Sequence, residues 1–422
     1  MGGIKRLQTL LARHASSTPT RVGRVLAVVL LGAGLQIVTQ ALLARSLPKT
    51  QVGLISLLLG ALPILSTLSM AGQSASAVRF LSRTESGTYD TVAHIRRVLA
   101  LVLPLGVVAG LAGAGFYELG WGLALVLVAL VVSQNTALTV SSVMRAEHRY
   151  ELAMTTVRFP AMAAAVVLVV LRLFDALTYT SALVTLGVTF GLSGLLIAVR
   201  GTRTSGTGGK PVPRSVLREG VFFLGLNLSF AIMVSVDKLV IGKMLPYAHL
   251  AVYASIFAVM RGFDFLFYSI TYVLMPRVNV LRKLELRKYN LLIAALAGFL
   301  TLGYLLLGDD VVSFLYAGHY DEGAYLILPF ALSGIAKLFY SVPSSVIGGR
   351  LPRSALKQFL WFNLGAVVVN IVLDIIMIKA MGLMGAAIAT AVAWGLRLAG
   401  GYVILARNRS LLAAPTEETL EV

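Results

Sequence analysis

The chain has 422 residues, of which 58% are hydrophobic and only 13% are charged. Soluble proteins carry roughly 25% charged residues, so this composition excludes an ordinary soluble fold. The formal net charge is +18, but the Lys and Arg residues fall in short loops between long apolar runs. That pattern is typical of membrane topology, and no nucleic-acid partner is expected.

Apolar runs of about 20 residues, the length that crosses a bilayer as a helix, follow one another along the whole chain. They are continuous and not alternating, which argues against membrane strands. The sequence therefore predicts an all-α integral membrane fold with about twelve transmembrane helices. The predicted spans are 24–43, 52–71, 98–116, 121–143, 152–171, 181–199, 220–241, 250–274, 291–307, 324–347, 358–378 and 382–405.

Lys and Arg are distributed unequally between alternate loops. One set of loops, which includes both chain ends, carries 26 of them, and the opposite set carries five. Because cytoplasmic loops are enriched in Lys and Arg, both termini are predicted to be cytoplasmic, in a multi-pass protein of the cell (inner) membrane. The N-terminal segment lacks the pattern of a cleaved signal peptide and is expected to be a retained tail.

Labelling with an impermeant thiol reagent tests this orientation. Single cysteines placed at Ser205 and at Asp321 should react from opposite sides of the membrane, because the predicted topology puts them in loops of opposite sets. The chain contains no cysteine of its own, so the background is clean. Labelling of both positions from the same side would overturn the topology.

A Gly-, Ser- and Thr-rich segment begins at Gly201 and becomes basic, which is typical of a flexible linker. It predicts an N-lobe (1–200, six spans), a cytoplasmic linker (201–219) and a C-lobe (220–422, six spans and a short tail). Residues 45–48 match residues 243–246 at an offset of 198. Six spans per half make this a parallel repeat, and transporters of that plan bind substrate between the halves.

Enzymatic chemistry has little basis in the residues. The absence of cysteine excludes disulfides and thiolate chemistry, and the five histidines have no metal-ligand spacing. The sequence shows no phosphate-binding Gly loop and no readable nucleophile–base arrangement. We therefore expect no enzymatic turnover, no metal and no cofactor.

Two segments carry a resemblance to a known family. The stretch from Asn370 to Thr390, NIVLDIIMIKAMGLMGAAIAT, has an Asn-containing helix end, a Gly turn and a Gly-Ala-Ala-x-Ala-Thr opening. The stretch from Asp237 to Tyr253, DKLVIGKMLPYAHLAVY, matches a second motif, although Ala251 replaces a common Gly. The chain resembles the Wzx-type polysaccharide and O-antigen flippases of the multidrug/oligosaccharidyl-lipid/polysaccharide (MOP) exporter superfamily.

This resemblance implies a fold and a function. The fold would be two six-helix, MATE-like lobes around a central cavity. The function would be outward translocation of an undecaprenyl-diphosphate-linked oligosaccharide or polysaccharide repeat unit by alternating access. The implied partners are the lipid-linked glycan, membrane lipids, and the polysaccharide polymerase and glycosyltransferases of the same route.

Charged residues at membrane depth cost roughly 2.5–3.5 kcal/mol each on insertion scales, so they usually face the bundle interior. Lys and Arg side chains at membrane depth could bind a diphosphate, because guanidinium and ammonium groups bind phosphate oxygens. The candidate substrate-binding residues are Lys337, Arg397, Arg261 and Lys238. For Lys238, and for Arg158 on the fifth span, the alternative is a side chain that reaches the membrane interface.

Each acidic or neutral polar residue at membrane depth has two possible roles. Asp264, Asp374 and Asp237 are candidates for binding a coupling ion or for locking helices together. Asp264 alternatively neutralises Arg261, three residues away. The polar residues of the first half either form a sugar-facing wall or hydrogen-bond between helices; they are Gln36, Gln40, Gln134 and Asn135.

Three other functions remain open. A cation-coupled multidrug (MATE-like) exporter would favour acidic residues in its cavity, whereas this chain has an excess of basic ones. A peptidoglycan lipid-precursor flippase of the same superfamily typically has fourteen spans. A membrane glycosyltransferase needs catalytic acids and a large loop, and the loops between the predicted spans are short. The identity of the glycan and of any coupling ion is not readable from the sequence.

Overall fold

The computed structural model describes residues 27–28, 30–82, 88–204, 209–278 and 286–409. Within these ranges the regular structure is helical, apart from one isolated bridge between Tyr89 and Lys210. The first half contains a helix over residues 30–46, followed by α2 (Lys49–Met70), α3 (Gln73–Leu81), α4 (Thr91–Phe116), α5 (Trp121–Ala146), α6 (Tyr150–Leu173) and α7 (Tyr179–Thr204). The second half contains α8 (Arg214–Met244), α9 (Tyr247–Val259), α10 (Gly262–Arg277), α11 (Leu286–Tyr316), η1 (Asp321–Leu326), α12 (Ile327–Arg350), α13 (Arg353–Met381) and α14 (Leu383–Arg407).

These helices account for the predicted spans. Ten of the described helices are each long and apolar enough to cross a membrane, and α9 with α10 forms an eleventh span that is bent by 52°. The helix over residues 30–46 stands where the first span is predicted. The predicted all-α membrane fold is confirmed. The short helix α3 and the bend within the eighth span were not predicted.

The predicted linker is partly helical. Helix α7 continues to Thr204 and α8 begins at Arg214, so both helices extend into the range 201–219. Residues 205–208 of the linker, and with them Ser205, lie outside the described residues, as do residues 1–26 and 410–422 of the two tails.

The repeated segment forms the same turn in both halves. Pro48 precedes α2 with φ −55° and ψ 144°, and Pro246 precedes α9 with φ −54° and ψ 143°. A proline holds φ near −65° and suits the start of a helix. The match between residues 45–48 and 243–246 thus corresponds to one backbone geometry, used between the first and second helix of each half.

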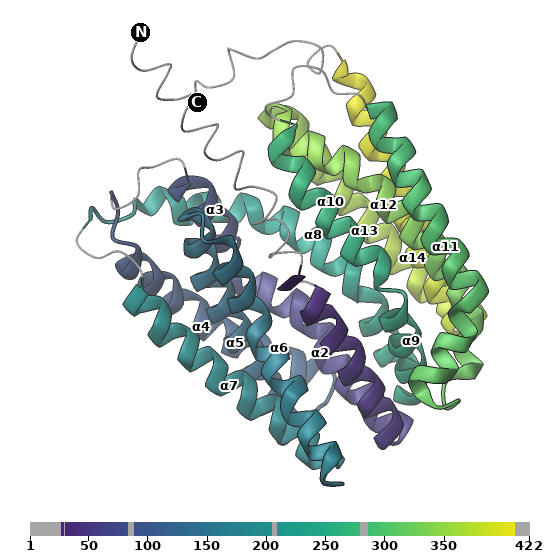
Figure 1. The fold of residues 1–422 in the computed structure, drawn as a ribbon. Helices are drawn as coiled ribbons and strands as arrows, with labels where there is room; N and C mark the ends of the chain where they lie inside the picture. Colours follow the sequence, from purple (N-terminus) through teal and green to yellow (C-terminus); the bar gives the residue numbers. More distant parts are fainter. Residues whose placement is uncertain (1–26, 29, 83–87, 205–208, 279–285, 410–422) are drawn as a thin grey trace.

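The two halves meet where α2 packs against α8 and α9, and again where α3 packs against α8. The other helices of the two halves diverge toward the C-terminal end of α14 (Figure 1). At the opposite end Arg45 donates to the carbonyl of Leu315 at 2.7 Å, and Lys49 forms an ion pair with Glu322. We call this end, with Arg45, Lys49 and Gly53, the closed end. The predicted orientation places it on the outer side of the membrane.

Candidate functional site

The four candidate cations come together around two aromatic rings. The Nζ of Lys238 lies 3.8 Å from the ring centroid of Phe257, and Lys337 and Arg261 each lie 6.0 Å from the same ring. Lys337 and Arg397 lie 4.8 and 5.3 Å from the ring of Trp394. The residues come from α8, the α9–α10 break, α12 and α14, so tertiary packing gathers charges that are far apart in sequence.

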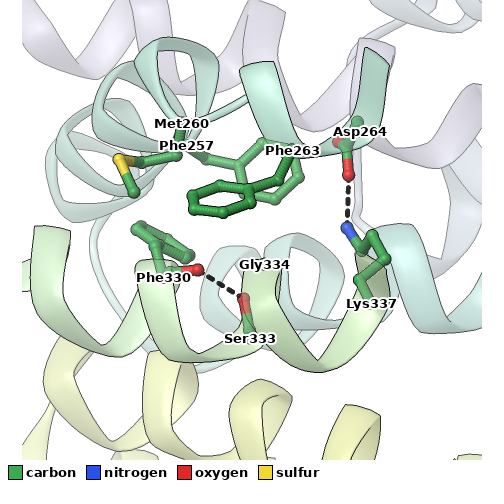
Figure 2. Close-up of a pocket in the computed structure, with 8 residues that line it drawn as sticks. All are labelled: Phe257, Met260, Phe263, Asp264, Phe330, Ser333, Gly334 and Lys337. Atoms are coloured by element: carbon green, nitrogen blue, oxygen red, sulfur yellow. Dashed lines mark hydrogen bonds and ion pairs between the residues drawn. The ribbon is translucent and has the colours of Figure 1, made fainter. Parts of the chain in front are cut away.

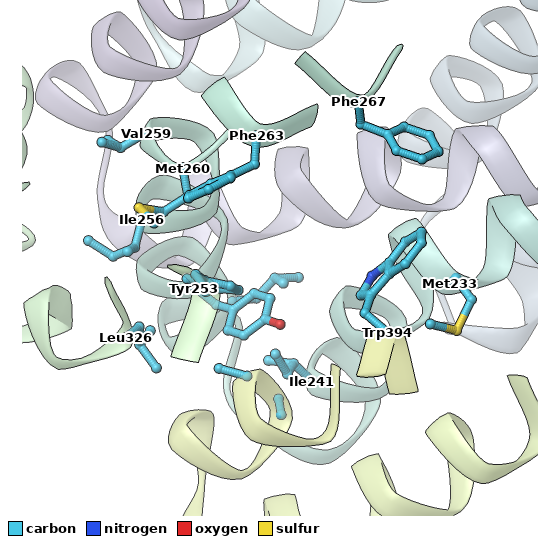
Figure 3. Packing of buried hydrophobic residues seen from close by; sticks show 14 of the residues in the cluster. Met233, Ile241, Tyr253, Ile256, Val259, Met260, Phe263, Phe267, Leu326 and Trp394 are labelled. Atoms are coloured by element: carbon cyan, nitrogen blue, oxygen red, sulfur yellow. The ribbon is translucent and has the colours of Figure 1, made fainter. Parts of the chain in front are cut away.

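Trp394 is fixed by an aromatic cluster. Its ring centroid lies 6.2 Å from Phe230, 6.3 Å from Phe267 and 5.7 Å from Tyr340, each in an edge-on geometry. Figure 3 shows Trp394 and Phe267 within this packing. Edge-on aromatic pairs are each worth about 0.5–1.5 kcal/mol beyond area burial. The ring that faces two cations is therefore held in a defined position.

Lys337 pairs with Asp264 in a buried ion pair between α12 and α10 (Figure 2). The sequence offered Arg261 as an alternative partner of Asp264, and this alternative is wrong. Both residues lie in the first turn of α10, but Arg261 donates to Gln36 of the first helix while Asp264 pairs with Lys337 of α12.

Arg261 instead bridges the two halves. Its Nη1 donates to the side-chain oxygen of Gln36 at 2.6 Å. One turn further along the same helix, Gln40 donates to Ser255 of α9 at 3.3 Å. These two glutamines form hydrogen bonds between helices, which is the more common role of such residues in membrane proteins.

The other two polar candidates of the first half lie on α5. Asn135 is fully buried and donates to Ser69 of α2 at 2.8 Å, so it joins helices within the first half. Gln134 is half-buried beside it.

Arg397 is the most deeply buried of the four cations, with 1% of its surface exposed. Its Nη2 donates to the hydroxyl of Ser229 at 3.1 Å, while Nε and Nη1 are buried without a hydrogen-bond partner in the structure. A guanidinium has five donors, and leaving buried donors unpaired is costly. Arg397 therefore has binding capacity that the described residues do not use.

Lys238 is also buried, with 6% of its surface exposed. It pairs with Asp237 at 3.7 Å and donates to the carbonyl of Val234 at 3.0 Å. Its side chain lies over Phe257 and does not reach the membrane interface, in contrast to the alternative suggested by the sequence.

A small pocket lies beside the Lys337–Asp264 pair (Figure 2). It is lined on its other sides by aromatic rings, among them Phe257, Phe263 and Phe330. The free space is about what a single water molecule needs. In this conformation the pocket is too small for a sugar.

The remaining carboxylates form a separate buried group between α8, α13 and α14. Asp237 accepts from the hydroxyl of Tyr253 at 2.5 Å, and Asp374 accepts from Asn370 at 3.2 Å. Both carboxylates act electrostatically on Tyr253. Two oxygens of this group are buried without a partner among the described residues: Asp374 Oδ1 and Asn370 Oδ1.

Oxygen ligands of this kind suit a hard cation. With both carboxylates ionised, the ammonium of Lys238 leaves the group with a net charge of −1, which one monovalent cation or one proton balances. Among the described residues no group of three or more His, Cys, Asp or Glu could hold a metal ion. Ion coupling and helix locking both stay predictions for Asp237 and Asp374.

Sodium should stabilise the protein if this group binds it. In thermal unfolding of the purified chain, replacing choline by Na⁺ at constant ionic strength should raise the Tm, since a ligand of the folded state stabilises it by mass action. The rise should disappear in Asp374→Asn and persist in Asp310→Asn, an exposed carboxylate on α11. If Na⁺ has no effect on the wild type at any pH, the group takes a proton or serves only to lock helices.

The model of the polysaccharide biosynthesis protein family matches residues 22–281. This chain belongs to that family. Its fold is that of the MOP-superfamily transporters. An inward-facing MATE family multidrug resistance transporter superimposes with a TM-score of 0.63, 13% identity, and coverage of 89% of this chain and 94% of that chain. The lipid II flippase MurJ, in an inward closed conformation, gives a TM-score of 0.66 at 11% identity over 91% of this chain and 87% of that one.

A third solved structure is a MOP-superfamily transporter from Pyrococcus furiosus, described as having a binding pocket of reverse polarity. It matches with a TM-score of 0.51 and 15% identity over 92% of this chain and 96% of that chain. A search of the curated proteins finds no match. The family member described here is thus a multi-pass membrane protein with the two-lobed architecture expected from its sequence.

Proposed function

We propose that this family member moves a lipid-diphosphate-linked glycan from the cytoplasmic to the outer leaflet, as a Wzx-type flippase acting by alternating access. The substrate would be an undecaprenyl-diphosphate-linked repeat unit, and the protein would act after glycosyltransferases and before a polymerase. It would carry out no covalent chemistry of its own. Membership in the polysaccharide biosynthesis family and the transporter fold support this proposal at the level of class.

The observation that supports the substrate class is the unbalanced charge at membrane depth. Lys238 and Lys337 have carboxylate partners. Arg261 and Arg397 hydrogen-bond only to neutral side chains within the described residues. Two guanidinium groups therefore remain to be neutralised, and a diphosphate supplies both the charge and the planar acceptors that guanidinium binds bidentately.

The charge pattern disfavours a multidrug exporter. A cavity for cationic drugs needs available carboxylates, but Asp264 pairs with Lys337, and Asp237 pairs with Lys238 and accepts from Tyr253. Of the three acids, only Asp374 has a buried oxygen without a partner among the described residues. The peptidoglycan-precursor flippases share a diphosphate-linked substrate. Their substrate differs from the proposed one only in the glycan, so the assay must vary the glycan.

A reconstituted flipping assay tests the proposal. Proteoliposomes with the purified chain should move a fluorescent undecaprenyl-diphosphate-linked oligosaccharide across the bilayer, and should move the monophosphate-linked analogue at least about tenfold more slowly, since one charge-assisted contact is worth about 1.5–3 kcal/mol. Efflux of a cationic dye without glycan transport would support an exporter instead. Preference for a lipid-linked peptidoglycan precursor would place the protein in the other flippase branch.

A further inference from the structure

Arg158 of α6 lies against the first helix of the chain. A Cβ atom added at Gly32 would lie 3.4 Å from the Cδ of Arg158, so the arginine stem packs against the face of the first helix that Gly32 presents. Its Nε is buried without a hydrogen-bond partner. The sequence suggested that Arg158 reaches the membrane interface, but its stem is directed at a neighbouring helix.

This position brings Arg158 next to Arg261. Gly32 and Gln36 are four residues apart in the helix over residues 30–46, so they lie one turn apart on the same face. Arg158 packs on the first and Arg261 donates to the second. The two side chains therefore reach neighbouring turns of one helix.

In the described part of the chain no carboxylate forms an ion pair with Arg158 or Arg261. The nearest acid in sequence, Asp264, is engaged by Lys337, and Arg261 uses a neutral amide as its acceptor. Two like charges that share a helix face repel each other, and an anion placed between them removes that repulsion. A diphosphate has acceptor oxygens on both phosphates, enough for two planar forks.

We propose that Arg158 and Arg261 form a clamp, with one guanidinium from each half of the protein, that binds the diphosphate group of the substrate. In the empty protein Arg261 rests on Gln36, and the arriving diphosphate replaces that amide as its acceptor. This proposal rests on the proposed function for its ligand. It adds a residue of the first half to a set of candidates that otherwise belongs to the second half.

Ligand-induced stabilisation of the full-length protein in detergent tests the clamp without transport. Inorganic pyrophosphate should raise the Tm more than sulfate does at equal ionic strength. A short prenyl diphosphate should act at lower concentration than pyrophosphate, and more strongly than the prenyl monophosphate. Arg158→Gln and Arg261→Gln should each weaken diphosphate binding about tenfold or more, while Arg158→Lys, which keeps the charge but loses the fork, should be intermediate.

Two further variants sharpen the result. Arg172→Gln, at the exposed far end of the same helix α6, should bind like the wild type. Gly32→Val should displace the Arg158 stem without changing any charge, and should weaken diphosphate binding although both arginines are present.

The outcomes separate the clamp from the proposed function. If the wild type binds neither pyrophosphate nor the prenyl diphosphate, or if Arg158→Gln binds them unchanged, the clamp is wrong, whatever the transport assay gives. If free pyrophosphate binds but the prenyl diphosphate does not, the site is one for a soluble anion. If both bind through Arg158 and yet no lipid-linked glycan is moved, the clamp stands and the proposed function fails.

Discussion

Transport of the lipid-linked glycan should fall by an order of magnitude or more when Arg397 is replaced by glutamine. The guanidinium of Arg397 has two buried nitrogens without partners, and loss of a hydrogen bond to a charged group costs about 1.5–3 kcal/mol. Glutamine keeps a donor near Ser229 and removes the charge. The measurement is the flipping assay, with matched protein levels in the membrane.

The same substitution should leave the fold intact or make it more stable. A buried charge without an ionic partner is costly, so its removal relieves the folded state of that cost. A protein with an unchanged or higher Tm and greatly reduced transport would show that Arg397 acts on the substrate. Arg407→Gln, at the exposed end of the same helix α14, is the matched control. Normal transport by Arg397→Gln would show that this guanidinium serves helix packing.

Lys337 needs a different design because it has an ionic partner. Lys337→Gln leaves Asp264 buried and unpaired, and breaking one side of a buried pair typically costs about 3–5 kcal/mol. The double variant Lys337→Gln/Asp264→Asn removes both charges and should recover most of the stability. If that double variant also recovers transport, the pair is structural. If it folds but does not transport, the charges of the pair act in transport and not only in packing.

Substitution of Gly53 by alanine should disrupt the closed end and lower transport about tenfold or more. A Cβ atom at Gly53 would lie 1.8 Å from the backbone oxygen of Tyr247, and backbone atoms cannot rotate away as a flexible side chain can. The first turns of α2 and α9 must therefore separate. A conformation in which this end is open would tolerate the methyl group. The equilibrium between the closed and the open conformation should therefore shift toward the open one.

Cross-linking measures that shift. Cysteines at Lys49 and Glu322, which form an ion pair across the closed end, should be joined readily by a short thiol reagent in the otherwise cysteine-free chain. Gly53→Ala should reduce the yield severalfold. Gly191→Ala on α7 has no neighbouring atom within 4 Å of the added carbon and should leave the yield unchanged. An unchanged yield in Gly53→Ala would mean that the closed end deforms locally and does not open.

Hydrophobic run length was sufficient to predict the spans, because each helix must satisfy its own backbone within the membrane. It could not predict the bend at Arg261. The prolines and glycines near this residue resemble those of spans that have no such break. The site residues were predictable as a class, from the cost of charge at membrane depth. Their pairing depends on which helices are neighbours, which a single sequence does not contain.

The packing of Arg158 was not predicted, for a related reason. Its distance from the end of α6 suggested an interfacial side chain, and the glycine that it packs against lies on another helix, more than a hundred residues away in the chain. Phe257 and Trp394 gave no signal at all, because aromatic residues are common throughout the sequence.

The twin turns at Pro48 and Pro246 point to descent of both halves from one duplicated six-helix ancestor. Their backbone angles have outlasted most of the side-chain identity between the copies. The ionisable groups have not stayed symmetrical: the four gathered cations and all three membrane-depth acids lie in the later copy. The first half supplies one buried arginine, Arg158, and otherwise mainly amides and glycines that contact the charged residues of the second half. Duplication was thus followed by divergence in charge, and most of the buried charge is now in the second half.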